Sequence, residues 1–174
     1  MDQVMKIILE TPRLILRQFT EADAAIIREL NTEPGVLQYI PEQVPESDEK
    51  ARQIILDIIL PQYKNNLGRW AVHLKENNEF IGWCGLKWLK ETGEIDLGYR
   101  FKPAAWGKGY ATEAAKYTLA YGLEKLKLKK IVAHAHIDNI GSQKVLEKIG
   151  MQYVGDGMED GVPVKGYASF NSIQ

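Results

Sequence analysis

Trp106-Gly107-Lys108-Gly109-Tyr110-Ala111-Thr112 is the stretch of this sequence that decides the fold. A run of strand-forming residues ends just before it at Phe101, and a helical pattern follows it in which Ala115, Leu119 and Leu123 share one face. The stretch therefore joins a strand to a helix, so backbone N–H groups and the positive end of the helix dipole point to one place. Such a place favours an anion.

The residues of this loop favour a phosphate group in particular. Gly107 and Gly109 allow backbone conformations and a close ligand approach that a Cβ atom would block. Lys108 adds a cation, and Thr112 adds a hydroxyl group in the first helical turn. A strand-to-helix turn that binds no ligand could contain the same two glycines. The surrounding sequence is therefore needed to distinguish a phosphate-binding loop from such a turn. The usual nucleotide motifs are excluded, because the Walker A pattern is missing and Thr112 occupies the position of the third glycine in the dinucleotide fingerprint.

Before the loop, the sequence predicts a strand and two helices followed by an antiparallel meander. The strand covers residues 13–17, and the helices begin at Thr20 and at Ser47, with Pro61 kinking or ending the second helix. Short runs of aromatic and branched residues then alternate with polar turns, which is typical of antiparallel strands; these runs are residues 70–74, 80–86 and 94–101.

After the loop, the sequence predicts a helix, a strand over residues 130–137, a short helix over residues 142–149, and a hairpin of residues 151–155 with 162–170. A strand, a helix and a strand within about 40 residues form a right-handed crossover, so the strands at 94–101 and 130–137 should be parallel. The predicted fold class is therefore mixed α/β: a mostly antiparallel sheet of six to seven strands flanked by about four helices, in one domain over residues 1–174.

Composition and charge exclude several kinds of partner. The 174 residues carry a formal charge of -1, so no global field attracts nucleic acid or an anionic membrane. The single Cys84 cannot form an internal disulfide, and three histidines without a cluster of Cys or His predict no metal site. Residues 1–10 contain too short an apolar stretch for a signal peptide, and no run of about 18 apolar residues follows. We expect a cytoplasmic protein with a small local ligand site, and neither nucleic acid nor membrane as a partner.

Together these features resemble the GNAT acetyltransferases. Residues 106–111 are similar to the family's Q/R-x-x-G-x-G/A acyl-CoA motif, with Trp106 in the Q/R place. Residues 106–114 read W-G-K-G-Y-A-T-E-A, which is the wording of the RimJ/RimL-like branch. Further similar segments are residues 9–17, 81–82, 97–99 and 139–150. The resemblance covers about residues 7–170, and its motifs are specific when they are taken together.

The resemblance implies that acetyl-CoA binds between the two parallel strands. In this superfamily these strands splay apart past a bulge, which here would fall near Asp96 to Tyr99, and the pantetheine arm pairs with the first strand. The loop would hold the pyrophosphate, and an unpaired N–H near Tyr99 would polarise the thioester carbonyl and stabilise the oxyanion. The implied cofactor-binding residues are Tyr99, Arg100, Phe101, Trp106, Gly107, Lys108, Gly109, Tyr110, Ala111, Thr112, Asn139 and Ser142.

The implied reaction is direct transfer of an acetyl group to a primary amine in a ternary complex. Because an α-amino group has a pKa of about 7.7 to 8.0 and a lysine amine one of about 10.4, deprotonating the lysine at pH 7 costs about 3 kcal/mol more. A protein or peptide N-terminal amine is therefore the leading acceptor. A small amine such as a polyamine, an amino acid or an aminoglycoside is the alternative, since the fold does not determine the acceptor. The rival from another class is a non-catalytic acyl-CoA-binding regulator, and a homodimer is common among relatives.

Asp96 is the first candidate for the general base, because relatives often carry an acid at this place on the strand that borders the acyl site. Pairing of its carboxylate with Arg100 or Lys87 is the structural alternative. His134 and His136 share one strand face by alternation, and for each of them ordinary sheet packing is favoured over a catalytic role.

Ser142 is the candidate for the acid that protonates the departing thiolate. Many GNAT members carry a tyrosine in the last helix, four residues before its closing glycine, and this chain has Leu146 there. In the RimJ/RimL-like branch a serine at the position of Ser142 takes this role, although serine is also a common helix N-cap. Glu159 with Asp160 could attract a cationic amine or form a solvated turn, and Glu10 is a less favoured base.

Overall fold

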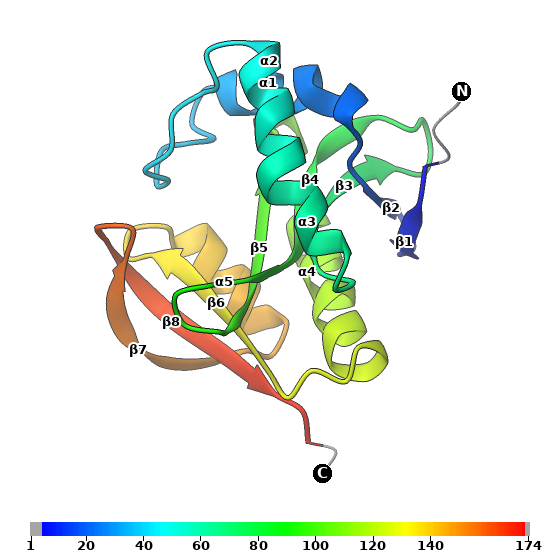
Figure 1. Cartoon of the computed structure of the whole chain (residues 1–174). Helices are drawn as coiled ribbons and strands as arrows, with labels where there is room; N and C mark the ends of the chain where they lie inside the picture. The colour runs from blue at the N-terminus through cyan, green and yellow to red at the C-terminus, as the bar shows by residue number, and fades with distance from the viewer. Residues whose placement is uncertain (1–4, 173–174) are drawn as a thin grey trace.

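One eight-stranded sheet forms the centre of the protein, and the computed structural model describes residues 5–172 (Figure 1). Neighbouring strands follow the order β1-β2-β3-β4-β5-β6-β8-β7 and are antiparallel except for β5 and β6. The strands are β1 (Ile7–Glu10), β2 (Leu14–Gln18), β3 (Gly68–Leu74), β4 (Phe80–Trp88), β5 (Ile95–Phe101), β6 (Lys130–His136), β7 (Gln152–Glu159) and β8 (Val162–Phe170). The predicted mixed, mostly antiparallel sheet is confirmed. The domain is predicted over residues 1–174. Of these, residues 1–4, which are part of the N-terminal stretch considered above, and residues 173–174 lie outside the described residues.

The sheet has one strand more than the six to seven predicted. β1 is four residues long, lies at the edge of the sheet, and pairs with β2 through a register shift between Ile7 and Leu9. So short an edge strand shows too few alternations of buried and exposed side chains to be recognised, and Ile7 itself is exposed.

Four helical runs flank the sheet in the described part of the chain, as predicted. They are α1 (Ala24–Thr32) with a preceding 3-10 turn (Glu21–Asp23), the continuous run of α2 (Asp48–Ile54), a π-helical turn (Ile55–Ile59) and α3 (Leu60–Tyr63), α4 (Tyr110–Ala120) with a π-helical turn (Tyr121–Lys125), and α5 (Ile140–Lys148). A separate 3-10 turn covers Pro103–Ala105. None of the helices among residues 5–172 has the length and apolar character that crossing a membrane requires.

The second helical run begins as the sequence predicts and ends differently. The Ser47 hydroxyl caps it by accepting a hydrogen bond from the Lys50 N–H at 3.1 Å. Pro61 does not end this helix. Proline has no backbone N–H to donate to the preceding turn, and the wide π-helical turn directly before it has a different hydrogen-bonding pattern that accommodates the missing donor. The helix therefore continues to Tyr63.

The sheet lies between two layers of helices. On one face, α4 and α5 bury Ala114, Ala115, Leu119 and Leu146 against strand side chains that include Trp70, Val72, Leu86, Leu97 and Ile131. On the other face, α1 and the α2–α3 run bury Ile27, Leu30, Ala51 and Ile55 against Phe19, Ala71 and Phe80. Because side chains alternate along a strand, β5 presents Tyr99 to the α4 layer and Asp96, Gly98 and Arg100 to the α1 layer.

β5 and β6 diverge after a single paired position. In the described residues the two strands pair in parallel at Asp96 and Val132, and beyond this point they diverge (Figure 1). The Lys102 N–H donates to a carbonyl of β4 at 2.8 Å, and the direction of backbone groups alternates along a strand. The N–H and C=O groups of Tyr99 and Phe101 therefore face the gap between β5 and β6.

The bulge predicted near Asp96 to Tyr99 is wrong for the pairing with β4, since β5 keeps one register from Ile95 to Phe101. The separation arises on the other side of β5. β6 pairs with β8 along its whole length, from Lys130 to His136, so β6 follows the twist of the terminal hairpin instead of that of β5.

We predict that a methyl group is tolerated on only one of two glycines that face each other across β4 and β5. A Cβ atom at Gly85 would lie 2.0 Å from the backbone oxygen of Gly68, whereas one at Gly98 would meet Trp83 at 3.5 Å. Gly85→Ala should therefore lower the free energy of unfolding by about 3 kcal/mol, and Gly98→Ala should change it by less than about 1 kcal/mol. Urea denaturation followed by circular dichroism measures both, and equal stabilities of the two variants would contradict this packing.

Candidate active site

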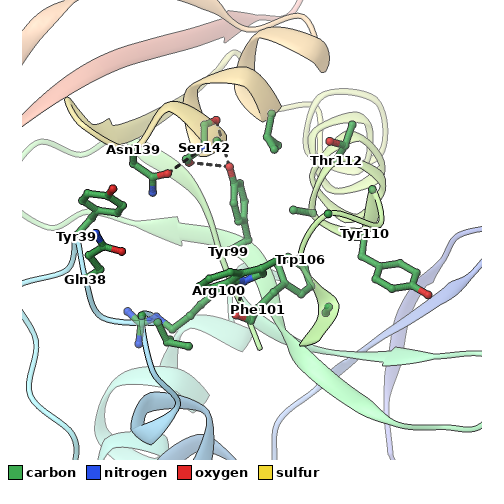
Figure 2. Close-up of a pocket in the computed structure, with 18 of the residues that line it drawn as sticks. Gln38, Tyr39, Tyr99, Arg100, Phe101, Trp106, Tyr110, Thr112, Asn139 and Ser142 are labelled. Atoms are coloured by element: carbon green, nitrogen blue, oxygen red, sulfur yellow. Dashed lines mark hydrogen bonds between the residues drawn. The ribbon is translucent and has the colours of Figure 1, made fainter. Parts of the chain in front are cut away.

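A cavity of about 560 Å³ lies at the diverging ends of β5 and β6 (Figure 2). Its wall is formed by β5, by the segment between β5 and α4, by the start of α5, and by residues 35–40 after α1. Of the predicted cofactor-binding residues, those that line it are Tyr99, Arg100, Phe101, Trp106, Gly107, Gly109, Tyr110, Ala111, Thr112, Asn139 and Ser142. The side chain of Lys108 is exposed and does not line the cavity. No prediction from the sequence pointed to the segment of residues 35–40, with Gln38 and Tyr39, as part of the site.

Gly107 and Gly109 have the left-handed backbone conformation that favours glycine. Their φ angles are +75° and +82°, and Gly109 is the N-cap of α4. The first turn of α4 lines the cavity, so its free N–H groups and the positive end of its dipole lie at the cavity wall. This arrangement suits the phosphate groups of a nucleotide-like ligand.

Arg13 fastens this loop to the start of the chain, a contact that the sequence pattern did not indicate. Its guanidinium donates from Nη1 to the Lys108 carbonyl at 3.0 Å and from Nε to Glu113 Oε1 at 2.7 Å, and it stacks 4.4 Å from the centre of the Tyr110 ring. Burial acts to raise the pKa of Glu113, but hydrogen bonds from Thr11 and Arg13 outweigh it, and the pKa is lowered. The ion pair between Arg13 and Glu113 is therefore fully formed at neutral pH, and it weakens as the pH falls through the lowered pKa of Glu113.

Tyr99 and Ser142 meet inside the cavity (Figure 2). The Tyr99 hydroxyl lies 2.8 Å from Ser142 Oγ, so a hydroxyl from β5 and one from α5 form a pair. Burial raises the pKa of Tyr99, against the hydrogen bond to Ser142 that lowers it, so the tyrosine stays protonated at neutral pH and keeps a hydrogen to donate. The sequence indicated Tyr99 only through its backbone, and its hydroxyl was missed.

The N-cap of α5 is Asn139 and not Ser142. Asn139 Oδ1 accepts a hydrogen bond from the Ser142 N–H at 3.1 Å, so the alternative role considered for Ser142 is wrong and its hydroxyl faces Tyr99 instead. Leu146, at the place of the family's helix tyrosine, is buried in the core, 1% exposed. Tyr99 thus brings a phenol to the cavity from the strand.

Asp96 lies on the other face of the sheet and outside the cavity lining, in a cluster with two other side chains. His134 Nδ1 lies 3.0 Å from Asp96 Oδ1 and 3.3 Å from Glu159 Oε2, so the cluster joins β5, β6 and the end of β7. The alternative pairing of Asp96 with Arg100 or Lys87 is wrong among the described residues, because the hydrogen-bonding partner of Asp96 is His134.

The cluster perturbs all three of its groups. Burial raises the pKa of Asp96 and that of Glu159, while the hydrogen bond to Asp96 raises the pKa of His134. An imidazole between two carboxylates favours its protonated form, so simple sheet packing does not account for His134. His136, two residues along β6, instead lies against the Tyr39 ring at 5.1 Å between centres. Glu10 is exposed at the end of β1 and does not line the cavity.

The family can now be assigned. A family model described as an acetyltransferase (GNAT) domain matches residues 13–152. The chain belongs to the GNAT acetyltransferase family. It is 35% identical over 150 residues to the uncharacterized N-acetyltransferase YoaA of Bacillus subtilis, covering 85% of this chain and 84% of that protein.

Solved structures of GNAT proteins have the same fold. An acetyltransferase of this family from Bacillus anthracis is 29% identical and superposes with a TM-score of 0.79, covering 94% of this chain and 98% of that one. RimL, a ribosomal alpha-N-protein acetyltransferase solved in complex with coenzyme A, is 18% identical and shares the fold with a TM-score of 0.82, over 97% of this chain and 100% of that one. This GNAT protein is accordingly an acyltransferase, and its cofactor is acetyl-CoA.

The residues present fit acetyl-CoA. The glycines at the start of α4 leave room for phosphate groups, and the backbone groups of Tyr99 and Phe101 at the gap suit the amides of a pantetheine arm. The cavity volume of about 560 Å³ also falls in the range of sites for ligands of this kind.

We predict that Gly109→Val weakens coenzyme A binding about tenfold or more, because a β-branched residue is strained at a φ of +82° and its Cβ would lie 3.3 Å from the Arg13 guanidinium. Isothermal titration with coenzyme A measures the effect. Gly93→Val is the matched control, since Gly93 has a φ of +73° in the turn between β4 and β5 and nothing within 4 Å of an added Cβ. Unaltered affinity of Gly109→Val would exclude the loop as the phosphate site.

Proposed function

We propose that this GNAT enzyme transfers the acetyl group of acetyl-CoA to a primary amine by direct attack within a ternary complex. The observation that carries the proposal is the continuity of the cavity, which runs from the start of α4 to the hydroxyl pair of Tyr99 and Ser142. The end of the cavity at the loop before α4 suits the pyrophosphate, and the end at β5 suits the thioester. A single cofactor can therefore occupy both ends.

Different residues of the chain bind different parts of the cofactor. Gly107 to Thr112 receive the phosphates through backbone N–H groups, with Trp106 holding the loop by donating its indole N–H to the Phe101 carbonyl at 2.9 Å. Tyr99 and Phe101 offer backbone groups to the pantetheine, and Asn139 and Ser142 line the far side. The Tyr99 N–H is the donor available to an acyl oxygen on which negative charge develops. We assign Lys108 only a long-range electrostatic contribution, because its side chain is exposed.

Acetyl-CoA supplies an activated acetyl group, so that a C–N bond forms as the C–S bond breaks and the thiolate departs. The pair of Tyr99 and Ser142 stabilises the departing sulfur by donating a hydrogen bond, since one of the two hydroxyl hydrogens is used within the pair and the other is available. Because burial raises the pKa of Tyr99 far above that of a thiol, at about 8.5, the pair does not need to surrender a proton. Ser142, expected from the sequence to be the acid, acts in this scheme as a hydrogen-bond donor together with Tyr99.

Asp96, His134 and Glu159 receive the amine. Two carboxylates around one imidazole leave the cluster with a net negative charge, which attracts an ammonium ion, and Asp96 accepts the proton that the amine loses. An α-amine needs little help, since its pKa of about 7.7 to 8.0 leaves part of it neutral at pH 7. We therefore propose an α-amino group as the acceptor.

The acceptor molecule has two candidates. A protein or peptide N-terminus is supported by the RimJ/RimL-like wording of residues 106–114 and by the fold shared with RimL, a protein alpha-N-acetyltransferase. A small amine is supported by two arginines on the acceptor face, Arg69 and Arg100. A cytoplasmic location, a homodimer and a single domain over the whole chain remain predictions of the sequence.

The decisive experiment is an amine panel incubated with acetyl-CoA, with thiol release as the readout and N-terminal peptides included. We expect release of coenzyme A with α-amines, faster than with lysine side-chain amines at pH 7. Binding of acetyl-CoA without turnover on any amine would support the non-catalytic regulator instead.

We predict that Asp96→Asn lowers kcat about a hundredfold or more, the typical contribution of a general base. The substitution also replaces the carboxylate that raises the pKa of His134 by a neutral amide, so this pKa should fall and the corresponding limb of the pH–rate profile should move to lower pH. Steady-state kinetics over a range of pH measures both effects. Asp57→Asn, an exposed carboxylate on the second helical run, is the control. An unchanged pH–rate profile would remove Asp96 as the base.

A further inference from the structure

Two arginines flank one tryptophan on the face of the sheet that carries Asp96. The Cζ atom of Arg69 lies 4.6 Å from the centre of the Trp83 ring, and that of Arg100 lies 5.4 Å from it. Cross-strand pairing places all three on the same face, because Trp83 is opposite Arg100 and Arg69 is opposite Gly85. Guanidinium groups therefore approach the tryptophan from β3 and from β5.

These arginines lack sufficient anionic partners. Arg100 is 7% exposed, donates from Nη1 to Asn31 at 2.8 Å and from Nη2 to Glu42 at 3.3 Å, and leaves its buried Nε–H without a partner among the described residues. Arg69 makes no ion pair or side-chain hydrogen bond within residues 5–172, and burial lowers its pKa although the charges of Glu42 and Asp96 act to raise it. Buried donors are normally satisfied, so the Nε–H of Arg100 is suited to an anion from outside the chain, and the guanidinium of Arg69 lies on the same face of Trp83's strand.

A glycine lies between the arginines and the acidic cluster on this face of the sheet. Gly98 lies between Asp96 and Arg100 on this face of β5, and a Cβ atom added to it would meet Trp83 at 3.5 Å and Asp96 Oδ2 at 3.7 Å. Gly98 therefore has only ordinary van der Waals neighbours, and its φ is not in the left-handed region, so neither strain nor close packing requires glycine. The absence of a side chain at Gly98 leaves the edge of the Trp83 ring and the Asp96 carboxylate as the nearest groups on this part of β5.

The face is thus negative at one end and positive at the other. Asp96, His134 and Glu159 form the negative end, and Arg69 and Arg100 form the positive end. Arg100 also lines the cavity, while Tyr99 next to it points to Ser142, so the positive end is continuous with the proposed acyl site (Figure 2).

We infer that the acceptor is a small amine that also carries a carboxylate, with its amine at the Asp96 cluster and its carboxylate at Arg69 and Arg100 beside Trp83. The inference rests on the proposed function. Arginine pairs well with carboxylates through charge-assisted hydrogen bonds. A polyamine would bring a second cation against the two arginines, which like-charge repulsion disfavours. The carboxylate could belong to a free amino acid or to an acidic short peptide.

The test compares acceptors that differ only in the carboxylate. Initial rates with acetyl-CoA are measured for an amino acid and its carboxamide, and for two C-terminally amidated tetrapeptides with either glutamate or glutamine at the second position. Wild type should show a kcat/KM about tenfold or more higher for the acid member of at least one pair, the size expected for a charge-assisted hydrogen bond. The pair that shows the preference identifies the source of the carboxylate.

Variants then assign the preference to the arginines. Arg69→Gln should lower kcat/KM for the acid about tenfold more than for the amide, Arg69→Lys should restore part of the difference, and Gly98→Ala should raise KM for the acceptor. Lys90→Gln, which removes one exposed charge from the turn between β4 and β5, should keep the wild-type ratio. Unchanged coenzyme A affinity and an unchanged urea midpoint in Arg69→Gln show that the fold is intact.

Two outcomes separate this inference from the proposed function. Acetyl transfer with equal kcat/KM for acid and amide in both pairs, or an acid preference that survives Arg69→Gln, would overturn the carboxylate site and leave the acetyltransferase proposal standing. Absence of transfer to every amine would overturn the proposed function itself.

Discussion

The site depends on the point where β5 and β6 stop pairing. The two strands are joined at Asp96 and Val132 and then diverge, because β6 stays paired with β8 while β5 stays in register with β4. A closed parallel pair would consume the backbone groups of Tyr99 and Phe101 in sheet hydrogen bonds. Divergence leaves the backbone groups of Tyr99 and the N–H of Phe101 available to a ligand, while the Phe101 carbonyl accepts from Trp106, and it opens the cavity between the strand ends and the start of α4.

In the proposed reaction, β5 serves both substrates because its side chains alternate. Tyr99 reaches Ser142 on the α4 side, where the cofactor cavity lies, whereas Asp96, Gly98 and Arg100 face the opposite side. A seven-residue strand therefore carries the donor side chain for the leaving group, the candidate base and one end of the acceptor site. The strand is held rigidly between β4 and the two helical layers, which suits a reaction that requires fixed distances.

The sequence revealed features that depend on neighbouring residues. Gly107 and Gly109 predicted the start of α4 because the backbone conformation they allow is a local property, and the spacing of strand, helix and strand predicted the parallel pair. β1 was missed because four residues at a sheet edge carry almost no pattern. The predicted bulge was wrong for the pairing with β4, because β5 separates from β6 on its other side, where β6 stays paired with β8, a strand distant in sequence from residues 95–101.

The sequence by itself determined the family and the cofactor and predicted the position of the proposed phosphate loop, since these follow from short contiguous motifs. Only the tertiary structure decided which side chains act together. Asp96 meets His134 across 38 positions of sequence, Tyr99 meets Ser142 across 43, and Arg13 holds Glu113 across 100. Such contacts depend on how distant strands and helices pack, and no local pattern encodes them. The acceptor site belongs to this second class, because the charges that define it come from three strands and a hairpin that the sheet brings to one face.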